Sequence, residues 1–204
     1  MDLQRYSMDQ SDENNLWKRF LSGNTEAFDL LMSQHFRTLF QYGSKFSKDK
    51  ELVKDCIQDL FLILWEKRTN LNKDAAVKPY LLASLRRLMH RSTASKSWIG
   101  DETLDNQEAH FDIEFSVEEQ YIQHESARIR SRQLKQLLDE LPKRQKEVIY
   151  LRFFQDMDRN QISEVMEITP QTVSNLLQIA IKQLKKQWII ALLTFLLVGL
   201  FLYN

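Results

Sequence analysis

One stretch of the sequence places carboxylates, an amide and a leucine on a single face of a helix. At about 3.6 residues per turn, four polar residues and one leucine fall on the same side of this helix: Asp55, Gln58, Asp59, Leu62 and Glu66. Paired carboxylates support acid–base catalysis, but no histidine or second carboxylate-bearing segment is implied nearby. A solvated face is the simplest interpretation, and a leucine exposed among polar groups favours a protein-binding surface over catalysis.

A second stretch combines an aromatic ring with cations. Tyr80, Arg87, His90 and Arg91 share one side of a predicted helix, and Arg86 is adjacent. A single-stranded nucleic-acid site needs these two components, a π-face for a base and cations for the backbone. The sequence leaves a second interpretation equally open, in which Tyr80 is half-buried core and the arginines are merely solvated.

A third stretch has the pattern of a helix-turn-helix, although an ordinary helical hairpin has a similar one. A helix over 159–166 and a short break precede Thr169, which suits an N-cap, and Pro170, which suits the first helical position. The polar residues that face outward on the second helix are Gln171, Ser174, Asn175, Gln178 and Lys182. Asn and Gln pair with adenine in the major groove, whereas Lys meets phosphate. A plain solvated face has the same composition, but the early positions favour recognition.

Helical periodicity in the rest of the chain supplies the elements that position these residues. Apolar faces predict helices ending at Gly23, starting after an Asn24 or Thr25 cap, running from about Asp49 to Lys67, and starting near Pro79. Farther along, a helix ends at 141–142, where a proline follows, and another covers about 143–153. The predicted fold class is all-α, with two small helical domains, the second a helix-turn-helix.

The composition excludes several classes of protein. The 204 residues are 43% hydrophobic, enough for a core, and Gly 4 and Pro 3 argue against a turn-rich β-sandwich. Lys+Arg 28 balance Asp+Glu 28, which excludes a uniformly polybasic binder. The lone Cys56 excludes an intramolecular disulfide, and the histidines lack metal-ligand spacing: His35, His90, His110 and His124. Phosphate-binding glycine loops and nucleophile motifs are missing, so we expect no enzyme, no metal and no cofactor.

Two segments depart from the helical pattern. Residues 101–119 hold eight carboxylates and no Lys or Arg, typical of a solvated linker that could also screen basic surfaces. The uncharged run 188–203 would reach roughly 24 Å as a helix, short of the ~30 Å bilayer core. It suits membrane contact and a tail buried on protein equally well. The predicted domains are 1–95, the linker 96–117, the helix-turn-helix domain 118–187 and the hydrophobic tail 188–204.

Three motifs, taken in their order along the chain, resemble those of one bacterial protein family. The run Asp55-Cys56-Ile57-Gln58-Asp59-Leu60-Phe61 with Leu64-Trp65 resembles the D-x-x-Q-D/E-x-F…W signature of extracytoplasmic-function (ECF) sigma factors. The Leu141-Pro142 run is similar to the opening of that family's second conserved domain. Ile162 and Thr172-Val173 fall where its helix-turn-helix carries "E-I-A" and "T-V". The resemblance covers both predicted domains and looks most like the Bacteroidetes branch.

The resemblance implies a role for each surface in promoter-specific initiation by core RNA polymerase. The first domain would dock on the β′ clamp helices through Asp55, Gln58, Asp59, Leu62 and Trp65. The loop 69–78 and the following helix would capture a base of the promoter −10 element through Tyr80, Arg86, Arg87, His90 and Arg91. The −35 element would be bound by Gln171, Thr172, Ser174, Asn175, Gln178 and Lys182. The linker would thread toward the RNA exit path.

The resemblance also implies a membrane-bound anti-sigma factor as partner and a cytoplasmic protein, or one tethered to the inner membrane by its tail. The first residues lack a positively charged start followed by an apolar run, so we expect no signal peptide. The family commonly has Asn at Arg87, Asp near Arg91, and Lys or Arg at Ser174 and Gln178, so weak promoter binding without polymerase is expected. The alternative function is a membrane-associated helix-turn-helix regulator that acts without polymerase. It leaves the 55–65 signature and the basic stripe unexplained, and a purely structural helical adaptor explains neither domain.

Overall fold

The computed structural model of the chain describes residues 10–97, 111–112 and 134–202, and every regular element within these ranges is a helix. The chain forms two compact units, residues 1–109 with 164–167 and residues 110–163 with 168–204. The first part holds α1 (Gln10–Leu21), α2 (Thr25–Gly43), α3 (Lys50–Lys67), the short 3-10 helix η1 (Arg68–Asn70) and α4 (Val77–Ser97). The second part holds α6 (Lys143–Phe153), α7 (Arg159–Met166) and α8 (Pro170–Leu202). The all-α prediction is confirmed for the described residues.

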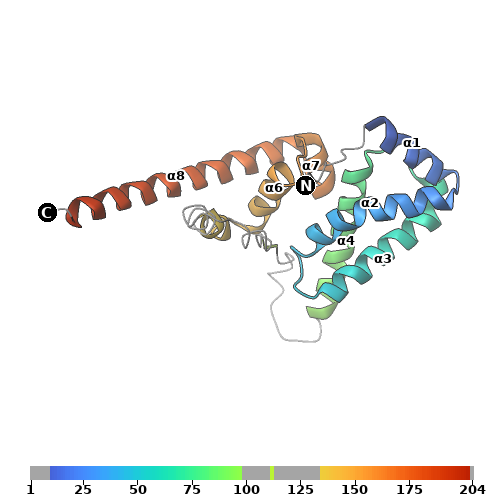
Figure 1. The fold of residues 1–204 in the computed structure, drawn as a ribbon, viewed down its shortest axis with the longest axis horizontal. Helices are drawn as coiled ribbons and strands as arrows, with labels where there is room; N and C mark the ends of the chain where they lie inside the picture. Colours follow the sequence, from blue (N-terminus) through green and yellow to red (C-terminus); the bar gives the residue numbers. More distant parts are fainter. Residues whose placement is uncertain (1–9, 98–110, 113–133, 203–204) are drawn as a thin grey trace, which may run out of the picture. The chain divides into compact units, whose positions relative to one another are not determined.

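The first unit is a small helical bundle in which α2 packs against α1, α3 and α4, and α3 also packs against α4 (Figure 1). Its largest fully buried side chains come from all of these helices: Trp17, Phe20, Leu31, Leu39, Tyr42, Ile57, Leu81, Leu82, Leu85 and Met89. Burial of a side chain of this size contributes about 1.5–3 kcal/mol each, so the shared core is the main stabilising term. This core sets which face of α3 and of α4 remains at the surface.

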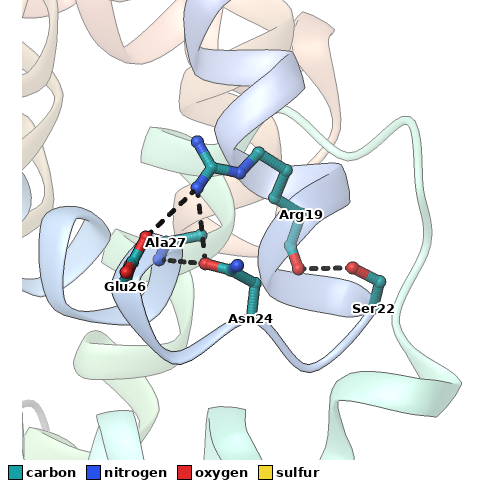
Figure 2. Close-up of polar contacts among 5 residues, drawn as sticks. All are labelled: Arg19, Ser22, Asn24, Glu26 and Ala27. Carbon is teal, nitrogen blue, oxygen red and sulfur yellow. Dashed lines mark hydrogen bonds and ion pairs between the residues drawn. The ribbon is translucent and has the colours of Figure 1, made fainter.

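Side-chain caps fix where α2 and α3 begin. Asn24 Oδ1 accepts a hydrogen bond from the Ala27 N–H at 2.7 Å, and Asp49 Oδ1 accepts one from the Leu52 N–H at 3.1 Å. Figure 2 shows the first of these caps together with Arg19, whose Nη2 lies 3.5 Å from Asn24 Oδ1 and 3.9 Å from Glu26 Oε2. Of the two caps that the sequence left open for α2, the structure selects Asn24. Each such cap contributes about 1 kcal/mol.

Two glycines shape the connections. Gly23 has φ +90, a left-handed conformation that L side chains rarely adopt, and it follows the end of α1. Gly43 ends α2 where a Cβ atom would lie 2.7 Å from Val53 Cγ1. The missing side chain therefore allows the end of α2 to lie close against α3.

Helix α4 begins two residues earlier than the sequence suggested. It starts at Val77, so Pro79 lies inside its first turn, where a proline is tolerated because the N–H it lacks would have no intrahelical partner. Leu81 and Leu85 are buried as expected, whereas Leu88 is only half-buried.

In the second part of the chain, α6 packs against α8. Residues 134–139 are helical and this segment ends before Pro142, as predicted from the proline. The bounds of α6 and α7 agree with the sequence prediction. Of the predicted linker 96–117, the structure describes only 96–97, which end α4, and 111–112. The linker's other residues lie outside the described ones.

Phe111 departs from the solvated-linker interpretation. It is only 2% exposed, and its ring centroid lies 5.9 Å from that of Tyr150 on α6. Tyr150 in turn stacks on Phe154 at 5.5 Å. An aromatic side chain inside an acidic segment finds an apolar partner whatever the charge of its neighbours, because burial of its ring is favourable. Phe111 therefore belongs to the core of the second unit.

We expect Tyr150 to make this unit sensitive to alkaline pH. Burial raises the pKa of Tyr150 to about 12 from an ordinary value near 10, although a hydrogen bond from Gln155 partly lowers it. Above pH 10 the unfolded chain loses the phenol proton while the folded chain keeps it, so stability falls as pH rises from 10 to about 12. The loss is about 2–3 kcal/mol at the upper end. Urea unfolding at pH 9 and 12 measures it, and an equal loss in Tyr150→Phe would contradict the assignment.

Helix α8 runs without a break from Pro170 to Leu202. It therefore includes the backbone of most of the predicted hydrophobic tail, whose side chains from 187 onward lie outside the described residues. Within the described residues, no helix is long and apolar enough to cross a membrane.

Candidate protein and nucleic-acid interfaces

Four of the five residues predicted to bind a protein form one exposed surface, which we name the α3 face: Asp55, Gln58, Asp59 and Leu62. Leu62 is 63% exposed. The opposite side of α3 is buried through Val53, Cys56, Ile57, Leu60, Phe61 and Leu64. Because six buried residues fix the rotation of α3, the polar face and its leucine are held toward solvent. An exposed leucine among carboxylates offers a partner protein an apolar contact, which we call the anchor.

The fifth residue, Trp65, is half-buried in an aromatic cluster. Its ring centroid lies 5.0 Å from that of Phe28 and 6.3 Å from that of Phe20. Arg68 covers the indole, with its Cζ 4.4 Å from the ring centroid, and donates a hydrogen bond from Nη1 to the Trp65 carbonyl at 2.7 Å. Trp65 therefore offers a partner only part of its ring, and its main contacts hold the end of α3 against α1 and α2.

On α4, Tyr80, Arg87 and Arg91 form a line that we name the α4 stripe. Spacings of 7 and 11 residues return to nearly the same side of a helix. Arg87 and Arg91 are exposed, and Tyr80 is half-buried with its ring centroid 6.0 Å from that of Trp17. Arg87 Nη2 donates to Ser84 Oγ at 3.0 Å. The described geometry thus provides a ring edge and two cations in a row.

Arg86 and His90 do not lie on this line. Both are half-buried, and the His90 ring packs edge-on against Phe46 with centroids 5.5 Å apart. At about 100° per residue, Arg86 and His90 project away from the α4 stripe toward the bundle. Of the five predicted residues, the structure therefore brings Tyr80, Arg87 and Arg91 together on one line and leaves Arg86 and His90 off it.

The loop between η1 and α4 reaches the surface beside the first turn of α4. Asn72, Lys73 and Asp74 are exposed at its tip. The indole N–H of Trp17, on α1, donates to the Asn72 carbonyl at 2.9 Å. Trp17 lies in the helix that the sequence predicts to end at Gly23, and a buried tryptophan usually has a hydrogen-bond acceptor for its N–H, which is the signal that could have indicated such a partner.

Side-chain caps fix where both helices of the helix-turn-helix begin. Asp158 Oδ1 accepts from the Asn160 and Gln161 N–H groups at 2.7 and 2.9 Å, and Gln161 Oε1 accepts from the Asp158 N–H at 3.0 Å. This is a capping box that starts α7. Thr169 Oγ1 accepts from the Thr172 N–H at 3.2 Å and starts α8, as the sequence predicted. Val173 and Ala180 are buried, so the opposite face of α8 points outward.

Four of the six predicted DNA-reading residues are exposed on the outward face of α8: Gln171, Asn175, Gln178 and Lys182. Gln171 Nε2 donates to Asn175 Oδ1 at 3.1 Å, so the two amides form a pair one helical turn long. Ser174 and Thr172 are half-buried and bond locally, Ser174 Oγ to the Pro170 carbonyl at 3.2 Å and Thr172 Oγ1 to Thr169 Oγ1 at 2.8 Å. Both hydroxyls therefore form hydrogen bonds within the first turn of α8.

Metal chemistry has no site in the part of the chain that the structure describes, where no group of three or more His, Cys, Asp or Glu side chains could hold an ion. Of the four histidines in the sequence, His110 and His124 lie outside the described residues.

Two family models match the chain. One, described as Sigma-70 region 2, matches residues 31–99, and the other, described as Sigma-70, region 4, matches residues 131–184. Together they cover more than half of the chain. The first range contains the α3 face and the α4 stripe, and the second contains α6, α7 and the outward face of α8.

Individual proteins support the same match. The chain is 24% identical over 171 residues to RNA polymerase sigma factor NccH of Alcaligenes xylosoxydans xylosoxydans, which covers 82% of this chain and 89% of the relative. The fold is similar to that of CnrH, solved in complex with the cytosolic domain of CnrY, with a TM-score of 0.58 at 19% identity over 86% of this chain and 96% of that one. It is also similar to the sigma factor RpoE of Bartonella quintana, solved with the anti-sigma factor NepR, with a TM-score of 0.56 at 16% identity over 78% and 94% of the two chains.

Proposed function

Because the chain belongs to the sigma-70 family, as an ECF-type sigma factor that directs promoter-specific initiation by RNA polymerase, we propose a separate role for each surface described above. The α3 face binds the β′ clamp helices of core polymerase. The α4 stripe and the neighbouring loop capture a base of the −10 element. The outward face of α8 binds the −35 element. The family is non-enzymatic, and a regulator that acts without polymerase would leave the region 2 match unexplained.

The exposed Leu62 within the α3 face is the observation that carries the polymerase-binding role. A 63% exposed leucine between Asp59 and its neighbours gains nothing in the isolated protein. Against a partner helix it becomes an apolar centre with a charged rim, the arrangement typical of specific protein interfaces. The carboxylates then select a basic partner surface.

The α4 stripe suits strand separation without ATP. Unstacking and unpairing a base costs a few kcal/mol, and an enclosed base together with a held backbone can offset that cost. Trp17 contacts both Tyr80 and the Asn72 carbonyl of the loop tip, and Arg87 and Arg91 continue the line from Tyr80 as cations for the phosphates. This arrangement supports capture of an extruded −10 base at the junction of loop and helix.

Site-specific photo-crosslinking tests the polymerase-binding role. A photoreactive amino acid replaces Gln58 on the α3 face or, as the control, Lys18, which is exposed on α1. After mixing with core polymerase, the position 58 variant is expected to give an adduct with β′ and the position 18 variant none. Equal adducts from both positions, or none from position 58, would argue against docking through the α3 face.

We also propose an anti-sigma factor as a regulatory partner. CnrH and RpoE were solved with CnrY and NepR. In this chain the first unit carries exposed apolar side chains on α2, Leu30 at 48% and Phe36 at 42%, in addition to Leu62 on α3. A segment that covers Leu62 would compete with polymerase. Whether that partner is membrane-bound, and whether the chain belongs to the Bacteroidetes branch, stay predictions from the sequence.

The continuous helix α8 supports a tether near the membrane. If the uncharged run 188–203 enters a bilayer, the DNA-reading residues lie on the same helix within about 30 Å of it, at 1.5 Å per residue. Deleting residues 188–204 is then expected to move the protein from the membrane fraction to the supernatant of lysed cells. A full-length Leu196→Lys, Leu197→Lys variant should behave like the deletion, since charges at membrane depth are costly. Supernatant localisation of the unaltered chain would discard the tether.

A further inference from the structure

One indole joins three parts of the first unit that are far apart in the sequence. Trp17 is fully buried, and its Nε1–H donates to the carbonyl of Asn72, 55 residues farther along the chain, at 2.9 Å. Its ring centroid lies 6.0 Å from that of Tyr80 and 5.2 Å from that of Phe20. Trp17 therefore contacts the loop tip on one side and the first residue of the α4 stripe on another.

The loop has a defined shape at the point where Trp17 holds it. Asn72 Oδ1 accepts from the Asp74 N–H at 3.0 Å, and the Asn72 carbonyl also accepts from the Ala75 N–H at 3.4 Å. The Asn72 side chain thus closes a local turn. The contact from Trp17 adds what local bonds cannot supply, a fixed position of this turn relative to the helical core.

The hydrogen bond is poorly suited to a purely stabilising role. Asn72 is exposed, so water can replace the indole as donor to its carbonyl, and one such bond contributes only modestly to folding. Removing the N–H while keeping an aromatic ring should leave the bundle folded. It should free the loop tip to move with respect to Tyr80.

We propose that Trp17 is a positioning residue for promoter melting: it holds the loop tip and Tyr80 at the separation that an extruded −10 base requires. The inference rests on the proposed base capture by the loop and the α4 stripe. Trp17 itself does not touch the base, because its ring is buried beneath both elements. Its effect is on the shape of the capturing surface, and therefore on which base is accepted.

The test uses the full chain bound to core polymerase and compares initiation on promoters that differ at the captured −10 position. The template is supplied both as a duplex and with the −10 region already unpaired. Trp17→Phe is expected to lower the preference for the cognate base about two- to tenfold on both templates, the range that one hydrogen bond supports. Affinity for core polymerase should stay within about twofold of the unaltered chain. Phe20→Leu, in the same core but at a side chain that cannot donate a hydrogen bond to the loop, is the matched control and should keep the preference.

A third variant separates this inference from the function on which it rests. Replacing residues 72–74 by Gly-Ser-Gly removes the loop tip and should abolish the preference. If that variant keeps the preference, base capture by the loop fails, and the role of Trp17 fails with it. If it loses the preference while Trp17→Phe keeps it, only the positioning role is overturned. Equal losses in Trp17→Phe and Phe20→Leu would likewise overturn it, since they would indicate general loosening of the core.

Discussion

Reversing one charge on the α3 face, Asp59→Arg, is expected to weaken binding to core RNA polymerase about 100-fold or more. Asp59 is exposed beside Leu62, at the centre of the surface that we assign to the β′ clamp helices. A basic partner surface that is complementary to carboxylates would meet a like charge, which costs several kcal/mol. Fluorescence anisotropy of labelled protein titrated with core polymerase measures the change.

The same experiment separates a specific contact from an effect of net charge. Asp29→Arg, at an exposed carboxylate on α2, changes the net charge equally and should leave affinity within about threefold. Leu62→Ala should cost about tenfold, because it removes the apolar anchor without adding a repulsive charge. Thermal melting of each variant shows that the bundle is folded. Similar affinities for Asp59→Arg and the unaltered chain would refute this docking surface.

Replacing the amide pair on α8 is expected to remove discrimination at the −35 element. Gln171 and Asn175 bond to each other at 3.1 Å in the free protein, so the proposed DNA-binding face presents the two amides as one unit. A well-placed bidentate contact to a base contributes about 1–3 kcal/mol of discrimination. Asn175→Ala should therefore reduce the preference for the cognate −35 sequence about tenfold or more. In the double variant, Gln171→Ala should reduce the preference by less than it does alone, because the two side chains are coupled.

Lys182→Ala is the matched control for base reading. Lys182 lies on the same exposed face about two turns beyond Asn175, and a lysine there can contact phosphate. Its loss should weaken binding to all sequences alike and reduce the salt slope by about 1. Both variants are measured in the polymerase complex, because Ser174 and Gln178 provide no cations for tight binding alone. A uniform loss of affinity in Asn175→Ala, with the −35 preference kept, would contradict base reading by this residue.

Much of this architecture could be predicted from local patterns. The bounds of α6 and α7, the cap at Thr169 and the buried stripe of α3 depend on residues within one or two turns. Because the buried stripe fixes the rotation of α3, the exposure of Asp55, Gln58, Asp59 and Leu62 could also be inferred. Capping and periodicity are local properties, and the sequence records them directly.

Contacts between distant residues could not be predicted in this way. The bond from Trp17 to the Asn72 carbonyl joins residues 55 positions apart, and no pattern along the chain indicates it. The rotation of His90 toward Phe46 depends on how the helices pack, which periodicity leaves open within about half a turn. The burial of Phe111 could not be predicted from its neighbours. An acidic segment that contains one buried ring has the same composition as a solvated linker.

Run-off transcription tests the central claim most directly. Purified core polymerase from a related bacterium is incubated with the full chain and a library of upstream regions, with Asp59→Arg in parallel. We predict discrete transcripts that require the protein, share −10 and −35 sequences and disappear with the variant. The absence of any transcript, with specific duplex binding retained, would contradict the account and favour a helix-turn-helix regulator that acts without polymerase.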